Sequence, residues 1–90
     1  MRSDWGRDDL MVVAAFRYCL GRQTYIVGDC ADWMVANWDK FNANTQSVIR
    51  RDLEVEFEND DIARAENRDY KSLGHDCDRR EWEKVRALYR

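Results

Sequence analysis

The densest group of ionisable side chains in the sequence is the stretch Asp52 to Asp61, which reads DLEVEFENDD and holds six carboxylates in ten residues. Carboxylates can transfer protons, ligate metal ions or form a negatively charged binding surface. Proton transfer needs a carboxylate beside partners in a cleft, and an abundance of acids does not supply that arrangement. A calcium loop needs a set ligand spacing with a central glycine, and the Asp60–Asp61 segment has neither. The stretch therefore favours a binding surface.

The three cysteines and the single histidine offer a second possible chemistry. His75 and Cys77 lie two residues apart, whereas zinc ligands usually come as C-x2-C with a second pair downstream, which this chain lacks. Residues two apart seldom face each other productively as a catalytic pair, and no serine has an obvious base. Cys19 and Cys30 are expected on inward helix faces as small hydrophobes. We therefore predict no metal, no cofactor and no enzymatic activity.

Charge is distributed unevenly along the 90 residues. Residues 1–50 carry six acids and six bases, and residues 51–90 carry twelve and nine, so the net charge of -3 belongs to the second half. Nucleic-acid binders normally show a basic stripe, which makes direct DNA or RNA binding unexpected. A protein partner with a basic surface fits better.

Composition and length predict one folded domain spanning residues 1–90. The chain is 44% hydrophobic and 12% aromatic, and a chain of this size can build only one core. An odd number of cysteines and a charged start, MRSDWGRDD, argue against a disulfide framework and a signal peptide, and so favour a reducing cytoplasm. The longest apolar run, Leu10 to Phe16, is far below the roughly 20 residues of a membrane helix.

A helical architecture is expected because proline is absent and four glycines punctuate the chain. The first helix should begin at Asp8 or Asp9 and end at Leu20. It is apolar on nearly every face, which predicts that the other helices surround it. Its exception, Arg17, should snorkel or pair with a carboxylate.

The next segment should turn at residues 22–24 and form a helix from Tyr25 or Gly28 to Asp39. The last helix should start with a capping box made by Asp78 and Glu81. Its inward stripe should contain Trp82, Val85 and Leu88 or Tyr89, and its negative end carries Arg86 and Arg90.

The acidic stretch itself could be a strand or a helix. A strand would place Leu53, Val55 and Phe57 on one face, but this alternation spans only about six residues and has no good pairing partner. A helix from Asn44 or Thr45 explains the apolar spacing from Val48 to Ile62, with a break or kink at Asp60 and Asp61. The chain is therefore predicted to be an all-α bundle of about four helices.

No base lies within the stretch from Asp52 to Asp61. Like charges one turn apart cost a few tenths of a kcal/mol per pair, so this feature is easier to explain if a partner binds it. The alternative is a solvated helix face, assisted by neighbouring arginines. Asp52 and Glu56 should pair internally, with Arg17 or Arg22 as partners. The expected partner-binding residues, which point outward, are Glu54, Glu58, Asp60 and Asp61, with Glu66 and Asp69 as extensions.

Four segments carry a family resemblance: FRYCLGRQTYIVGDCADWMV, VIRRDLEVEF, DDIAR and LGHDCDRREWEKVR. Together they resemble a family of small acidic proteins carried by temperate phages and other bacterial mobile elements. Proteins of this kind include anti-CRISPR inhibitors, several of which block the DNA-binding groove of a surveillance complex. The resemblance implies a phage-encoded inhibitor in the bacterial host cytoplasm, whose acidic face mimics DNA and binds a CRISPR-Cas effector protein with a basic groove. The alternative is a phage structural or regulatory interaction protein, which an exposed patch around Trp5 or Trp33 would favour.

Overall fold

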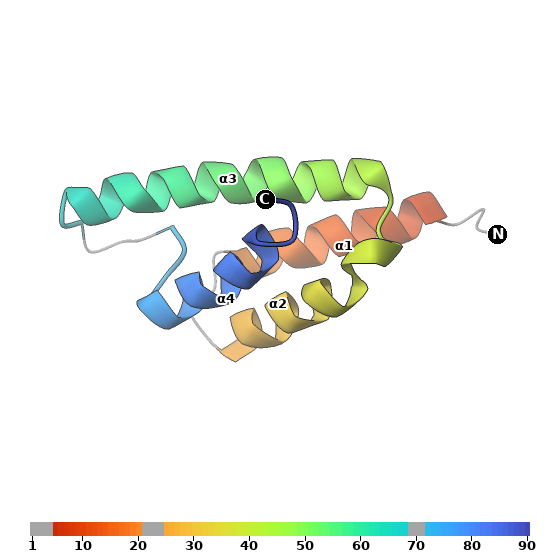
Figure 1. Cartoon of the computed structure of the whole chain (residues 1–90), viewed down its shortest axis with the longest axis horizontal. Coiled ribbons are helices and arrows are strands. Elements are labelled where there is room, and N and C mark those ends of the chain that lie inside the picture. The colour runs from red at the N-terminus through yellow and green to blue at the C-terminus, as the bar shows by residue number, and fades with distance from the viewer. Residues whose placement is uncertain (1–4, 21–24, 69–71) are drawn as a thin grey trace.

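The computed structural model describes residues 5–20, 25–68 and 72–90, with the side chains of residues 5–9 and Tyr25 outside the description. Its elements are α1 (Trp5–Leu20), α2 (Tyr25–Asn37), the short 3-10 helix η1 (Trp38–Lys40), α3 (Ala43–Ala65) and α4 (Asp76–Arg86). No strand occurs among these residues. The predicted all-α fold of about four helices is confirmed (Figure 1). The turn expected at residues 22–24 lies outside the described residues.

The starts of three helices differ from those expected. Helix α1 begins at Trp5, ahead of the expected Asp8 or Asp9, and α3 and α4 begin after other caps than those predicted. Helix α3 begins after Asn42, whose side-chain oxygen accepts a hydrogen bond from the Thr45 amide at 2.8 Å. Helix α4 begins after His75, and Asp78 accepts the His75 amide at 3.1 Å from inside the first turn. Asp78 is therefore the third helical residue and not the cap. Each cap satisfies an amide that the first turn of a helix leaves without a partner.

Helix α3 runs without interruption through Asp60 and Asp61, so the predicted break at this point is wrong. Its 23 residues give a length of about 35 Å. Asp60 faces inward and is bonded there, which removes the repulsion that a row of exposed acids would cause.

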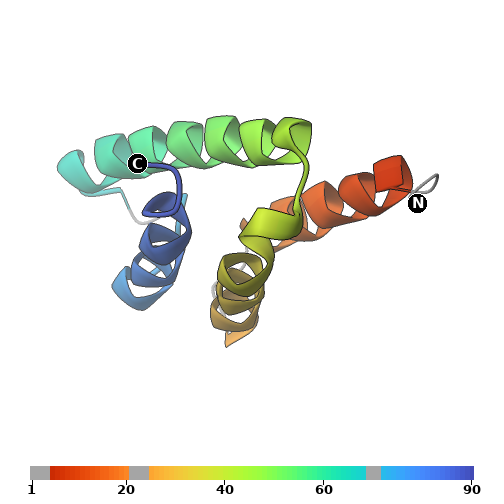
Figure 2. The same cartoon turned by 45° about the vertical axis from the view of Figure 1, so that its right-hand side comes forward.

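Helix α3 lies along one side of the molecule, and the other three helices pack beneath it (Figures 1 and 2). Close backbone packing joins α1 to α2, α1 to α3 and α2 to α4. The pair α3 and α4 is not among these, and long arginine side chains bridge these two helices instead. This spacing leaves a surface depression between α3 and the end of α4.

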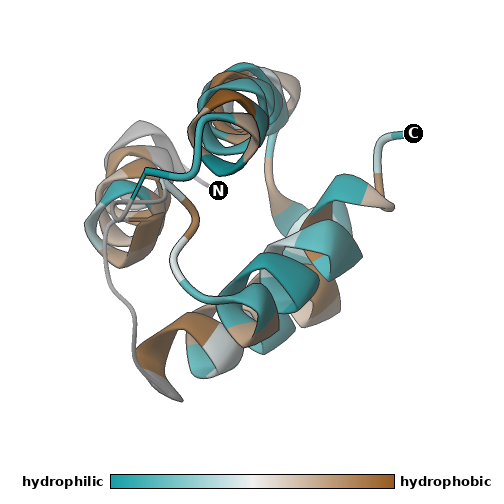
Figure 3. Ribbon diagram, turned by 90° about the vertical axis from the view of Figure 1, so that its left-hand side faces the viewer, coloured by the Kyte–Doolittle hydropathy of each residue, from teal (hydrophilic) through white to brown (hydrophobic). Residues whose placement is uncertain are grey.

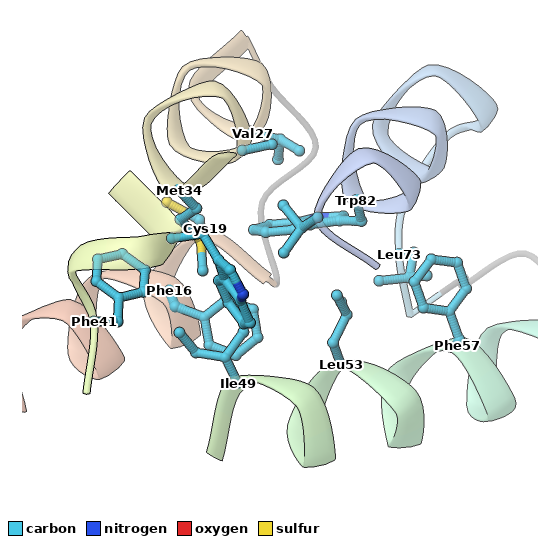
Figure 4. Close-up of a cluster of buried hydrophobic side chains, with 13 residues drawn as sticks. Phe16, Cys19, Val27, Met34, Phe41, Ile49, Leu53, Phe57, Leu73 and Trp82 are labelled. Atoms are coloured by element: carbon cyan, nitrogen blue, oxygen red, sulfur yellow. The ribbon is translucent and has the colours of Figure 1, made fainter. Parts of the chain in front are cut away.

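The core is built from apolar side chains of all four helices and the segment before α4 (Figure 4). Trp82 from α4 is fully buried and meets the Phe16 ring edge-on at a centroid distance of 5.6 Å. Leu53 and Phe57 point inward from α3, as the helical pattern predicts. Val85 is also buried as predicted, whereas Leu88 is exposed and Tyr89 half-buried.

The other helices do not surround α1, which corrects the expectation for the most apolar segment. Phe16 and Cys19 are buried, but Leu10, Met11 and Tyr18 are exposed. The reason is that α4 packs on α2 and leaves only α2 and α3 as close neighbours of α1. Brown and pale segments occur along α1 in Figure 3, in keeping with its apolar sequence.

Candidate partner-binding surface

The six carboxylates of the acidic stretch lie on one helix but in very different surroundings. Asp52 accepts a hydrogen bond from Arg17 of α1 at 2.8 Å, which confirms the internal pairing expected for both residues. Glu56 has no ion pair with any other described residue, so the internal pairing expected for it is not found there; Arg17 pairs with Asp52, and Arg22 lies outside the described residues. Burial, together with the charges of Asp52 and Asp60, raises the pKa of Glu56 above its usual value. Helix α3 thus carries one carboxylate that is paired with an arginine, Asp52, and one whose charged form is disfavoured, Glu56.

Asp60 is fully buried, so the expectation that it belongs to a contact surface is wrong. Arg64 donates to its carboxylate at 2.5 Å, Arg79 at 2.6 Å and the Leu73 amide at 3.1 Å. Burial alone would raise the pKa of Asp60, but these hydrogen bonds outweigh it and hold the pKa below its usual value. Asp60 therefore ties α3 to α4 and to the segment that precedes α4.

Glu54 was expected to point freely outward, and the structure corrects this. Arg86 of α4 donates two hydrogen bonds to its carboxylate, at 2.7 and 2.9 Å, and the Tyr89 hydroxyl donates a third at 2.6 Å. The Arg86 hydrogen bonds lower the pKa of Glu54 to about 2, although burial acts in the opposite direction. Two-point contact between a guanidinium and a carboxylate is the strongest form of such a pair. Glu54 keeps a third of its side chain exposed.

The remaining predicted residues stay at the surface. Glu58 is exposed as expected. Asp61 is 62% exposed although Arg79 contacts it at 2.7 Å, and Glu66 is 54% exposed beside Arg68. Asp69 lies outside the described residues. The acidic surface that folding leaves is thus smaller than the sequence indicates.

Three of the predicted residues line one open depression between α3 and α4. Its lining consists of Glu54, Val55, Glu58, Asp61, Ile62 and Arg86. Val55 and Ile62 are 47% and 45% exposed and lie among the carboxylates of this lining. Three carboxylates against one arginine leave a formal charge of -2 around them. The depression therefore combines two exposed apolar side chains with an excess of negative charge.

Two further depressions follow along α3 toward its start. The first is lined by Arg50, Glu54, Tyr89 and Arg90. The second is lined by Trp38, Ala43, Gln46, Ser47, Arg50, Leu88 and Tyr89. Because neighbouring depressions share lining residues, we treat the three as one surface, the α3 groove. It is acidic at the Asp61 end and basic at the Arg50 and Arg90 end.

The guanidinium groups that shape this groove also pack on an aromatic ring. Arg86 lies 4.3 Å and Arg79 4.9 Å from the centre of the Phe57 ring. Cation–π contact of this kind fixes both side chains in place. The sequence contained a signal for this role, since Arg79, Trp82, Arg86 and Tyr89 recur at helical spacing, but Arg86 was assigned only to the helix end.

The three cysteines are free thiols, of which Cys19 is buried, Cys30 partly buried and Cys77 exposed. Burial, and then the neighbouring thiol of Cys19, raise the pKa of Cys30 to about 12. A thiol with such a pKa stays protonated at neutral pH and is a weak nucleophile. Among the described residues, no three His, Cys, Asp or Glu side chains are placed to hold a metal ion. Nor does any described helix combine the length and apolar character that a membrane crossing needs.

The fold and groove define a small all-helical protein with a mixed apolar and charged surface groove. Comparison with known proteins adds no relative, since no family model, curated protein or solved structure matches the chain.

Proposed function

We propose that this chain is a non-enzymatic binding protein whose α3 groove holds a segment of a partner protein. The observation that carries the proposal is the pair Val55 and Ile62, which are nearly half exposed inside a rim of carboxylates. Exposed apolar side chains within a polar rim are typical of protein interfaces. A segment that places a lysine or arginine next to apolar residues would complement this surface.

Within this class, we propose a phage-encoded inhibitor that binds a basic surface of a CRISPR-Cas surveillance complex and keeps target DNA away. The sequence resemblance supports the choice, together with the exposure of Glu58 and Asp61. Arginines of the same chain neutralise Glu54 and Asp60. Such an inhibitor would therefore not present a continuous row of free negative charges like that of a DNA backbone. Contact would depend on the exposed apolar side chains of the groove, Val55 and Ile62. The carboxylates around them would favour a basic partner and raise the association rate.

The second candidate is a phage structural or regulatory interaction module without inhibitory activity. A specific observation favours it: Trp33 on α2 is 48% exposed, and its ring lies 5.7 Å from the centre of the Phe41 ring at a tilt of 38°. Tryptophan is enriched among the residues that contribute most to the binding energy of protein interfaces.

Binding of the purified chain to a type I surveillance complex, followed by a DNA-loading competition, separates these candidates. If the chain is an inhibitor, it binds the surveillance complex and lowers DNA loading in proportion to the fraction of the complex that it occupies. If the chain binds and DNA loads normally, the groove-blocking mechanism is wrong and the second candidate stands. If it does not bind, the inhibitor proposal fails for that complex.

Point variants test whether the α3 groove is the contact. Glu58→Lys and Ile62→Ser should each weaken binding at least tenfold. The first reverses a negative charge in the lining of the groove, and the second removes apolar contact area. Asp39→Lys is the matched control, since it makes the same charge reversal at an exposed carboxylate on η1. Equal binding by Glu58→Lys and Asp39→Lys would place the interface elsewhere. Helical circular dichroism checks that each variant folds.

A further inference from the structure

The α3 groove carries opposite charges toward its two ends. At one end, Arg50 and Arg90 are exposed, and neither forms an ion pair with another described residue. Toward the other end, Glu58 is exposed and likewise has no ion pair within the described part of the chain. Asp61 contacts Arg79, but the same guanidinium also binds a buried carboxylate of α3. Folding therefore leaves positive charge at one end of the groove and negative charge at the other.

Glu54 lies between the two ends and does not cancel the charge of either. Arg86 donates two hydrogen bonds to its carboxylate, and the Tyr89 hydroxyl donates a third. One guanidinium and one carboxylate thus neutralise each other in the middle of the groove. The charges that remain available to a ligand are the two arginines on one side and Glu58 and Asp61 on the other.

We propose that the occupant of the α3 groove is a protein segment with an acidic side chain toward one end, a basic side chain toward the other and apolar side chains between them. This inference rests on the proposed function, in which the groove holds a partner segment, and it adds the chemistry of that segment. The acidic side chain lies between Arg50 and Arg90, and the basic side chain lies beside Glu58 and Asp61. Complementary charges at both ends select such a partner, whereas a segment of a single sign meets repulsion at one end.

The spacing of the partner's charges follows from the spacing along α3. Glu58 and Asp61 follow Arg50 by 8 and 11 residues. These steps correspond to about 12 and 17 Å along the axis of an α-helix. An extended segment covers the same distance in about four to five residues, and a helical segment needs about eight to eleven. Val55 lies within this span and Ile62 at its end, so the partner's apolar residues fall between its charges or next to the base.

Selection from a random peptide library displayed on phage tests this chemistry without assuming a particular partner. The full chain is the bait, and the peptides retained are those whose binding is lost with Ile62→Ser, which removes apolar contact area from the groove. The expected peptides carry Asp or Glu and Lys or Arg on opposite sides of apolar residues, at the spacing given above. Helical circular dichroism checks that each variant of the chain folds.

A charge swap assigns the acidic side chain of the peptide to the arginine pair. Arg50→Glu should weaken binding of a selected peptide at least tenfold. Replacing the acidic residue of the peptide with lysine should restore binding to this variant and weaken binding to the wild-type chain. Arg80→Glu is the matched control and should bind the peptide as wild type does. Arg80 is an exposed arginine of α4 that lies outside the groove lining and forms no ion pair with another described residue.

The inference is overturned if the groove-dependent peptides carry basic residues only, or if they bind Arg50→Glu and the wild-type chain equally. The arginine pair is then not part of the contact, and the proposed function stands with a purely basic segment. A library that yields no groove-dependent peptide also overturns the inference. Binding to the surveillance complex then decides the proposed function separately.

Discussion

Two regions differ from what their sequences suggest about burial: the contact between α3 and α4, and the outer face of α1. The α3–α4 contact includes the most acidic segment of the chain, yet Asp60 is fully buried there and Glu54 is hydrogen-bonded by Arg86 and Tyr89. Helix α1 holds the longest apolar run, yet Leu10 and Met11 are mostly exposed. The comparison shows that burial follows from which helices meet, and that the polarity of a segment does not decide it alone.

The Asp60 cluster should give the largest effect in a test of this comparison. Asp60→Ala removes the charge that Arg64 and Arg79 share and leaves two guanidinium groups without their central partner. Breaking a buried ion pair in this way costs about 3–5 kcal/mol of unfolding free energy. Urea denaturation measures it, with Glu58→Ala as the exposed control, for which a change within about 0.5 kcal/mol is expected. Equal losses for the two variants would contradict the buried role of Asp60.

Glu54 should have a smaller and pH-dependent effect. Glu54→Gln keeps the shape but loses the charge, and should cost about 1–2 kcal/mol at neutral pH because Arg86 remains partly buried. The pKa of Glu54 in the folded state is about 2, below the usual 4.5, so its contribution is fully present above about pH 4.5. Thermal melts of wild type and variant should therefore converge as the pH falls from 4.5 toward 2. A constant difference across that range would rule out the ion pair as its source.

Glu56 lies two residues away and should show the opposite sign. Its pKa is raised in the folded state, so ionisation at neutral pH opposes folding. Glu56→Gln should make the protein more stable at pH 7, by less than Glu54→Gln destabilises it, and the gain should vanish as the pH drops and Glu56 becomes protonated. The same melts provide the measurement. A loss of stability at pH 7 would show that Glu56 has a partner in the native state.

The smallest effect on folding is expected on α1. Leu10→Ala should change the unfolding free energy by no more than about 0.5 kcal/mol, because the side chain is already 70% exposed. Leu53→Ala, the same change at a fully buried position on α3, should cost about 2–5 kcal/mol. Urea denaturation compares the two. Similar losses would mean that Leu10 is buried within the folded chain.

Much of the fold could be predicted from the sequence because helix formation is largely local. The apolar spacing from Ile49 to Phe57 identified α3 as a helix and its inward face, and Gly21 marked the end of α1 at Leu20. An internal partner for Asp52 was also predicted, with Arg17 and Arg22 as the two alternatives, and the structure places Arg17 there. The cap of α3 was misplaced by two to three residues, because Asn42, Asn44 and Thr45 are all good caps in sequence.

The binding surface could be predicted only in part. Glu58 and Asp61 remain at the surface as expected, and with Glu54 they line the α3 groove. Nothing local in the sequence shows that Glu54 meets side chains 32 and 35 positions later, or that Asp60 meets Arg79 19 positions later. Those contacts depend on the approach angle of α4.

The sequence by itself determined the number of helices, the inward apolar residues Ile49, Leu53 and Phe57 of α3 and the excess of acid on that helix, because each follows from side-chain periodicity and charge within a few turns. Only the tertiary structure decided which acids are neutralised and which apolar residues stay in water. The physical reason is that α4 packs on α2, so that its arginines reach the carboxylates of α3 while the outer face of α1 is left without a helix to cover it.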